Sequence, residues 1–481
     1  MGLWTKKSII DLHSKAELSS HSLKRTLGSL DLILLGIGVI IGAGLFSITG
    51  IAAAQHAGPA IIISFVIAAI ACALAALCYS ELASMIPISG SAYTYAYVTM
   101  GELLAWIIGW TLILEYAIGA AAVAISWSAY LVSFLHQFGI PIPMALMASP
   151  WHPTLDANGE LVYGIFNLPA VFILGLMTSI LIIGIKESAL INAILVTVKV
   201  AVVLIFIGVG IQYIQAENYQ PFIPENSGVF GEFGWSGILR AAGIVFFAYI
   251  GFDCVSTAAQ ETINPQKNMP IGILGALSIC TVLYIVFTFV MVGLIKYTEL
   301  NVAAPAALAI DQTPYHWLQW MIKLAIIAGF SSVILVLLLG QSRIFYTMSC
   351  DGLLPKLFSD LHPKWCTPWK SSLALFLLIG PLAAFVPLEI LGNMTSIGTL
   401  FAFLIVCGGT LILRYTHPEY PRKFRTPWVP FVPLLGMAVC ALLMASLSFD
   451  TWLRLLIWLA IGLVVYFFYG SRREKSRQEG P

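Results

Sequence analysis

Charged residues are scarce in this chain, and their scarcity excludes most classes of protein. Of its 481 residues, 10% are Asp, Glu, Lys or Arg and 59% are hydrophobic. A soluble globular domain has about 25% charged residues, so water is not the main solvent of this chain. The net charge of +1 argues against a nucleic-acid partner, which requires a clustered basic surface. The high hydrophobicity also excludes a disordered chain.

Motifs for metal binding, disulfide frameworks and common hydrolases are also missing. No CxxC pair, HExxH or GxSxG occurs, and the eight histidines avoid the centres of the apolar runs. We therefore expect no metal site, no disulfide framework and no enzyme activity, with a polytopic membrane enzyme as a distant alternative. The polar, basic beginning does not resemble a signal peptide. The eight cysteines lie in apolar runs or basic connecting segments: Cys72, Cys78, Cys254, Cys280, Cys350, Cys366, Cys407 and Cys440.

Long apolar runs are what the sequence has in abundance. A run of about 20 apolar residues crosses the hydrocarbon core of a bilayer as a helix. We predict an all-α polytopic membrane protein with one transmembrane domain over residues 29–470. Four connections, 136–165, 216–234, 296–318 and 348–370, are expected to be loops or short helices. Twelve spans are predicted near 30–54, 58–86, 99–135, 166–185, 190–215, 235–260, 271–295, 319–347, 371–388, 392–414, 428–448 and 451–470.

Lysine and arginine predict the orientation. If both termini are cytoplasmic, the inner segments hold 19 of the 24 Lys and Arg residues, and the outer connections 136–165 and 216–234 hold none. This asymmetry follows the rule that basic residues stay inside. We therefore expect a cytoplasmic N-terminal segment (1–28), in which Lys24 and Arg25 flank the first span, and a cytoplasmic tail (471–481). The expected location is the plasma membrane.

Two spans carry signs of a break in the helix. In the first span, four glycines fall within nine residues, between Gly36 and Gly44. They suit either close helix packing or an unwound segment whose N–H groups face an anionic ligand. The sixth span carries Gly251 followed closely by Asp253, five spans later, which favours unwinding. An odd separation implies inverted repeats, here 29–215 and 235–415, with two further helices in 427–470.

Three ionisable residues lie at membrane depth, where charges are costly and usually functional. Lys199 forms either a structural ion pair with Glu115 or Asp253, or a group that takes up and releases a proton. Glu115 either faces a cavity or is a protonated packing residue, and Asp253 is expected to cap the second break. Glu81 and Asp31 lie near inner span ends, where we expect an interfacial anchor or a helix cap.

Several motifs in this order resemble the amino acid–polyamine–organocation superfamily, and within it the bacterial cationic amino acid transporter-like group, over nearly the whole chain. They are Gly42-Ala43-Gly44-Leu45-Phe46, Ser80-Glu81 to Ser89-Gly90-Ser91-Ala92-Tyr93, Gly109-Trp110 to Leu114-Glu115-Tyr116, Lys186-Glu187-Ser188 leading to Lys199, Phe246-Phe247-Ala248-Tyr249-Ile250-Gly251-Phe252-Asp253, Asn264-Pro265-Gln266-Lys267-Asn268-Met269-Pro270 and Asp351-Gly352-Leu353-Leu354-Pro355.

The resemblance implies a five-plus-five inverted repeat and specific site residues. Amides matching Gly42, Ala43 and Gly44 would hold a substrate α-carboxylate. The residues whose carbonyls would hold the α-amino group match Ile40, Phe247, Ala248 and Ile250. Lys199 would couple transport to protons, beside Ser331 and Ser332, which otherwise suit helix packing. Three residues depart from the family pattern and leave substrate range and gating open: Ala43, Gln260 and Cys350.

Together these features predict a secondary transporter of cationic or small neutral L-amino acids, taken up with protons by alternating access. The side chain of the substrate would face Glu115 and Tyr116, and Phe247 suits either a gate or a packing role. An exchanger without net proton coupling is the main alternative. No cofactor is expected, and sodium is the weaker candidate for a coupling ion. The expected partners are the amino acid and the lipid bilayer; any small membrane subunit cannot be named from the sequence.

Overall fold

The computed structural model describes residues 6–7, 26–86, 90–147, 149–150, 154–155, 161–184, 189–365 and 367–478. Lys15, Lys24, Arg25, Lys186 and Cys366 therefore lie outside the described residues, as do Ser89 and the Lys186-Glu187-Ser188 motif. The longer helices are α2 (Ser29–Ile40), α4 (Ile61–Met85), α5 (Ser91–Thr99), α6 (Glu102–Leu112), α7 (Gly119–Gln137), α8 (Leu168–Ile183), α9 (Ala189–Gly210), α10 (Gly234–Val245), α11 (Pro265–Leu294), α13 (His316–Cys350), α14 (Trp369–Phe385), α15 (Leu388–Thr416), α16 (Phe431–Ser446) and α17 (Phe449–Gln478).

Short elements complete the chain. They are η1 (Gly44–Ile48), α3 (Thr49–Ala52), η2 (Ala53–Ala57), η3 (Gly58–Ala60), η4 (Ile113–Ile118), η5 (Met144–Leu146), β1 (Thr154–Leu155), β2 (Leu161–Val162), η6 (Ile211–Tyr213), η7 (Ala216–Tyr219), η8 (Phe246–Tyr249), η9 (Asp253–Glu261), η10 (Tyr297–Glu299), α12 (Pro305–Ile310) and η11 (Lys356–Phe358). The expected connections contain short helices, and one of them also contains a two-stranded antiparallel hairpin, β1 with β2, that the sequence did not predict.

Each of the twelve predicted spans overlaps a helix of the structure. Among the described residues, eight helical segments are long and apolar enough to cross a membrane, and three further apolar helices, α8, α14 and α16, are shorter. One of the eight, Ser29–Met85, contains two predicted spans joined by a turn near Gly58. The chain is thus a polytopic, almost wholly helical membrane protein, whereas the number of crossings stays a prediction.

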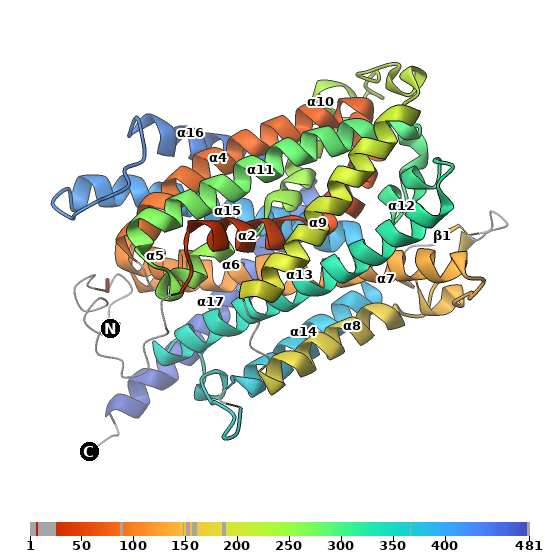
Figure 1. Ribbon diagram of the computed structural model, residues 1–481. Coiled ribbons are helices and arrows are strands. Elements are labelled where there is room, and N and C mark those ends of the chain that lie inside the picture. The colour runs from red at the N-terminus through yellow and green to blue at the C-terminus, as the bar shows by residue number, and fades with distance from the viewer. Residues whose placement is uncertain are drawn as a thin grey trace.

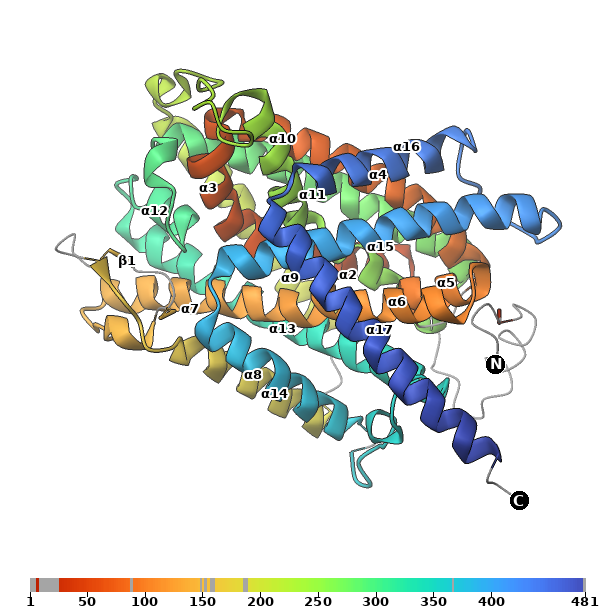
Figure 2. The same ribbon diagram turned by 180° about the vertical axis from the view of Figure 1, so that it is seen from behind.

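The helices form a bundle around the broken first span. In Figures 1 and 2, α4 and α11 lie side by side along one flank, and α8 and α14 pair on another. The short α2 lies inside the bundle, in contact with α11, α9 and α13. Figure 2 shows α17 crossing the outside of the bundle over α6 and α15. Because α2 is surrounded by other helices, its irregular end is shielded from lipid, as unpaired backbone groups at membrane depth require.

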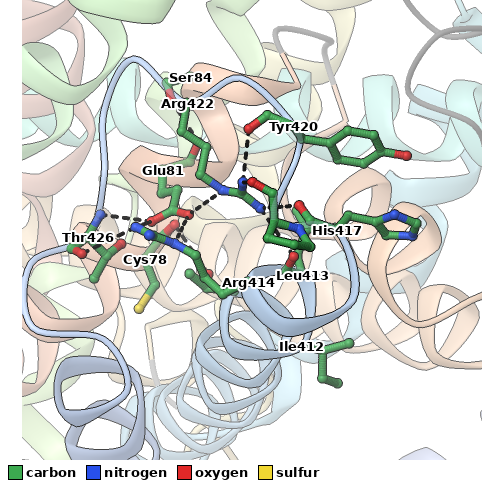
Figure 3. A network of polar contacts seen from close by, with 12 residues as sticks. Cys78, Glu81, Ser84, Ile412, Leu413, Arg414, His417, Tyr420, Arg422 and Thr426 are labelled. Atoms are coloured by element: carbon green, nitrogen blue, oxygen red, sulfur yellow. Dashed lines mark hydrogen bonds and ion pairs between the residues drawn. The ribbon is translucent and has the colours of Figure 1, made fainter.

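A buried charge network ties α4 to the segment after α15 (Figure 3). Glu81 is 1% exposed and accepts hydrogen bonds from Arg414 Nε at 2.7 Å and from Arg422 Nε at 3.1 Å. The backbone N–H of Thr426 donates to the same carboxylate at 2.8 Å. The sequence did not predict these partners of Glu81, which lie more than 300 residues away along the chain. Asp31 does cap its helix, accepting from Gly28 N at 2.8 Å.

Candidate functional site

The first break interrupts the helix that begins at Ser29. Helix α2 ends at Ile40, and Ile41 adopts extended angles (φ −71°, ψ 98°) before a wide turn, η1, begins at Gly44. An extended residue cannot continue the ladder of backbone hydrogen bonds, so backbone groups on both sides of Ile41 are released from it. Gly44 also lets the chain approach the sixth span: a Cβ there would lie 2.2 Å from the Ala248 Cα.

The second break lies in the sixth span, as the sequence predicted. Helix α10 ends at Val245, the tighter turn η8 follows, and Ile250 is extended (ψ 137°). Gly251 has a φ of +109°, and a Cβ on it would lie 2.4 Å from Val39 Cγ1. Only glycine satisfies both the left-handed backbone and the close approach to the first span. The two breaks therefore face each other across a contact made by small residues.

A pocket lies between the two breaks. We call it the central pocket, and its lining residues are Val39, Ile40, Gly42, Ala43, Gly44, Glu115, Gly119, Val123, Phe247, Ile250, Val333 and Leu337. The structure thus brings together residues from the first, third, sixth and eighth predicted spans. Of the predicted substrate-binding residues, only Tyr116 and Ala248 are outside this lining.

Glu115 brings a carboxylate to the central pocket from a wide helical turn. The six residues of η4 (Ile113–Ile118) interrupt the third span, a feature the sequence did not predict and one that is frequent at functional sites. Glu115 is fully buried, and neither of its carboxylate oxygens has a hydrogen-bond partner among the described residues. A buried acceptor without a partner is costly, so this group is available to a donor that enters the pocket.

Asp253 links the second break to the third span. Its Oδ2 accepts hydrogen bonds from the hydroxyl groups of Tyr116 and, at 3.2 Å, Ser91, while Oδ1 has no partner within the described part of the chain. Tyr116 is therefore turned toward Asp253 and away from the central pocket. The sequence predicted a cap for the second break at Asp253; these contacts instead join its carboxylate to side chains of α5 and η4. They also remove Tyr116 as a side chain that could face a substrate directly in this conformation.

Tyr284 occupies the carbonyls that the resemblance assigns to the substrate. Its hydroxyl, on α11, lies 2.6 Å from the Ile40 carbonyl oxygen and 3.0 Å from the Ala248 carbonyl oxygen. Its single proton is shared between these two acceptors, one from each broken span. Tyr284 is fully buried, with its ring against Phe65 and Tyr249. The sequence did not single it out, since a tyrosine within an apolar run gives no signal of its own.

Lys199 also bonds to the first break. Its Nζ donates to the Gly38 carbonyl at 2.5 Å, and its stem packs against Gly329 on α13. Lys199 does not form the ion pair with Glu115 or Asp253 that the sequence left open. Among the described residues, both Glu115 carboxylate oxygens and Asp253 Oδ1 have no hydrogen-bond partner, and Asp253 Oδ2 accepts only from hydroxyl groups. A lysine at membrane depth whose Nζ donates to a backbone carbonyl is consistent with intramembrane lysines facing partners inside the bundle.

Ser331 and Ser332 follow Gly329 on the same helix. Ser331 accepts a hydrogen bond from Trp127 Nε1 at 3.0 Å, and Ser332 donates to the Gly329 carbonyl at 2.9 Å. Their hydroxyls are therefore used in helix packing in this conformation, the alternative left open by the sequence. Of the three departures from the family pattern, Ala43 lines the central pocket, Cys350 is exposed at the end of α13, and the Gln260 side chain lies outside the described parts.

Two interrupted helices that face a pocket inside a bundle of apolar helices define a membrane transporter. The comparisons with known proteins give the family. A model of the amino acid permease family matches residues 27–469, and the chain belongs to this family, within the amino acid–polyamine–organocation superfamily. Family members and relatives are permeases and transporters rather than enzymes.

The chain is similar to transporters with different named substrates. It is 45% identical to the methylthioribose transporter of Bacillus subtilis (strain 168), over 98% of each chain. It is 43% identical to the branched-chain amino acid permease BcaP of the same organism, over 99% of each chain. The vacuolar cationic amino acid transporter 4 of Arabidopsis thaliana is 38% identical, over 86% of this chain and 67% of the relative.

Proposed function

We propose that the protein takes up L-amino acids, cationic or small neutral, by proton-coupled alternating access. One observation carries this proposal: residues of the first break, residues of the second break and the Glu115 carboxylate line the same central pocket. That carboxylate has no hydrogen-bond partner among the described residues. An amino acid has a carboxylate and an ammonium group a few bonds apart. A pocket that offers N–H groups on one side and acceptors on the other matches that pair of charges.

Each end of the amino acid has its own residues in this proposal. The N–H groups of Gly42, Ala43 and Gly44 hold the carboxylate. The carbonyls of Ile40, Phe247, Ala248 and Ile250 hold the ammonium group, and to reach two of them the ligand displaces the Tyr284 hydroxyl. Glu115 then faces the substrate side chain, which favours a cationic end because a buried carboxylate gains most from a charged donor. Phe247 lies at the edge of the pocket, where a gate is expected.

In this proposal, protonation and deprotonation of Lys199 couple substrate transport to proton transport. While it is charged, its bond to Gly38 holds the end of α2 against α9. Loss of the proton weakens a charge-assisted hydrogen bond to a neutral one, which frees α2 to move relative to the helices that pack around it. Proton release and movement of the first break are linked in this way. Sodium has no role in the proposal, because the lysine ammonium already supplies a positive charge there.

Two alternatives have support of their own. An exchanger uses the same pocket without net proton movement. Methylthioribose transport is favoured by the 45% identical relative, although a methylthio sugar carries neither the carboxylate nor the ammonium group that the two breaks match.

The deciding experiment is uptake of radiolabelled amino acids by proteoliposomes, with and without an imposed pH gradient. We expect accumulation that needs the gradient. Counterflow that ignores the gradient would indicate the exchanger, and uptake of methylthioribose alone would overturn the assignment to amino acids.

The same proposal includes the arrangement in the membrane. We infer twelve crossings, two inverted repeats at 29–215 and 235–415, two further helices within 427–470, and cytoplasmic termini in the plasma membrane. The lysine and arginine distribution supports the orientation, and the paired breaks support the repeat. Cysteine-accessibility labelling of Lys296→Cys, at an expected outer end, and Lys356→Cys, at an expected inner end, tests the orientation. Labelling of Lys356→Cys from outside would contradict it.

A further inference from the structure

A second pocket lies above the central one, at the end of the bundle that we predict to be outside. This outer pocket is lined by residues of η1, α3, η2, α10 and α15. Ile48, Gln55 and His56 come from the first span, Ile244 from α10, and Glu389 and Asn393 from the start of α15. None of these residues belongs to the site described above.

The polar groups of the outer pocket are mainly hydrogen-bond acceptors. Glu389 has no ion-pair or hydrogen-bond partner among the described residues. Asn393 is 9% exposed, and its Oδ1 is buried without a partner in the same part of the chain. The His56 Nδ1 lies 2.6 Å from the Gly231 carbonyl. Because a carbonyl only accepts, Nδ1 carries the proton, and Nε2 of the neutral ring is a further acceptor.

The outer pocket and the central pocket are lined by neighbouring turns of the first and sixth spans. The first span contributes Ile48 to the outer pocket and Gly44 to the central one, and the sixth contributes Ile244 and Phe247 in the same order. Residues three to four apart are about one helical turn apart. Ser396 on α15 donates to the Ile244 carbonyl at 3.3 Å. A ligand held in the outer pocket is thus one turn of helix from the central pocket.

The charges around the outer pocket also favour a cation. The outer connections 136–165 and 216–234 contain acidic residues but no Lys or Arg. The positive charge of Arg240 and the negative charge of Glu232 have opposite electrostatic effects on the His56 ring. The Arg240 Nε donates a hydrogen bond to the Ser446 carbonyl at 3.0 Å. Within the lining, the Glu389 carboxylate is therefore a charge that has no partner among the described residues.

We propose that the outer pocket is a binding site for the ammonium or guanidinium group of a cationic amino acid, which it holds before the amino acid reaches the central pocket. This inference rests on the proposed function for the identity of the cargo. The Glu389 carboxylate and the Asn393 amide oxygen have no partners among the described residues and lie in a site partly closed from water. A charged donor forms strong hydrogen bonds with such acceptors. A zwitterion is held less well, because its carboxylate would lie against Glu389.

The test uses 1,5-diaminopentane, which carries ammonium groups but lacks the carboxylate that the first break would hold. Its affinity is measured by calorimetry on the purified full-length protein. We expect Glu389→Gln to weaken diamine binding by about tenfold or more, since a charge-assisted bond becomes a neutral one. Asn393→Ala should weaken it by a smaller factor. One control variant should leave it within about twofold: Glu217→Gln, an exposed carboxylate outside both pockets.

Three outcomes would overturn the outer site: no diamine binding by the unmodified protein, equal affinity in Glu389→Gln, or an equal loss in Glu217→Gln. Equal affinity in Glu389→Gln together with a loss in Glu115→Gln would place the diamine in the central pocket, and an equal loss in Glu217→Gln would reduce the effect to surface charge. Alanine uptake by proteoliposomes is measured in parallel. Absence of uptake with intact, Glu389-dependent diamine binding would count against the proposed function and not against the outer site.

Discussion

The Lys199 ammonium group lies 2.5 Å from the carbonyl oxygen of Gly38, across the interface between α9 and α2. That oxygen belongs to the last turn of a helix that stops two residues later, at Ile40. The lysine therefore holds one edge of the first break, and the Tyr284 hydroxyl holds the adjacent carbonyl of Ile40. Two side chains from two other helices fix the backbone on which substrate recognition depends in our proposal.

Replacing Lys199 by alanine should abolish accumulation of amino acids driven by a pH gradient while leaving part of the binding. The central pocket does not include Lys199 in its lining, so its walls remain, whereas the charged group that responds to protons is gone. Uptake with and without a gradient, and calorimetric binding, measure the two effects separately. Lys296→Ala, an exposed lysine at the end of α11, is the matched control. Unchanged gradient-driven accumulation would remove Lys199 from the mechanism.

Tyr284→Phe should tighten amino acid binding and lower the thermal stability of the protein without amino acid. The hydroxyl proton is shared between two released carbonyls, and leaving buried acceptors unpaired costs about 1–3 kcal/mol. The ligand ammonium no longer has to displace a hydroxyl, so stabilisation by added amino acid should grow. Thermal unfolding with and without amino acid gives both quantities.

Tyr249→Phe is the control for this change, because that ring packs against Tyr284 but its hydroxyl donates to the Phe65 carbonyl, outside the two breaks. A Tyr284→Phe protein with weaker amino acid binding would show that the hydroxyl assists the substrate and does not compete with it.

Glu115→Gln should weaken binding of arginine and lysine more than binding of alanine. The buried carboxylate has no partner among the described residues, so a cationic side chain gains a charge-assisted bond that glutamine cannot supply; the difference should be about tenfold. Glu102→Gln, in the same span and bonded to Tyr97 and Tyr466, is the control and should not discriminate. Equal losses for the three amino acids in Glu115→Gln would argue against a role in selectivity.

The breaks were predictable because their signals are local. Glycines at 42, 44 and 251 mark places where a helix is weak, and at Gly44 and Gly251 the structure also needs a close approach or a positive φ. The contacts of Tyr284 with Ile40 and Ala248 were not predictable, because they join three segments more than 30 residues apart through tertiary packing. The wide turn at Ile113–Ile118 has no composition that distinguishes it from a regular apolar helix. Local propensity locates a break, and only packing shows what satisfies it.

The Glu81 network gives a prediction about stability. Glu81 and Arg422 are almost fully buried, with side chains 2% and 3% exposed, and Arg414 is 20% exposed. Replacing Glu81 by glutamine leaves two guanidinium groups without their common carboxylate, and removing one partner of a buried ion pair costs about 3–5 kcal/mol. We therefore expect a marked drop in the thermal midpoint of the purified protein, with α4 detached from the segment after α15.

A surface ion pair in the same protein provides the control. The Lys370 Nζ lies 2.6 Å from Asp360 Oδ2, but the two side chains are 33% and 46% exposed. Because solvent screens such pairs, Asp360→Asn should change stability by no more than about 1 kcal/mol. A double-mutant cycle of Glu81→Gln with Arg422→Gln then measures the coupling between the two buried groups. If the Glu81 and Asp360 variants lose equal stability, or if the cycle shows no coupling, the buried network does not hold α4 to the end of α15.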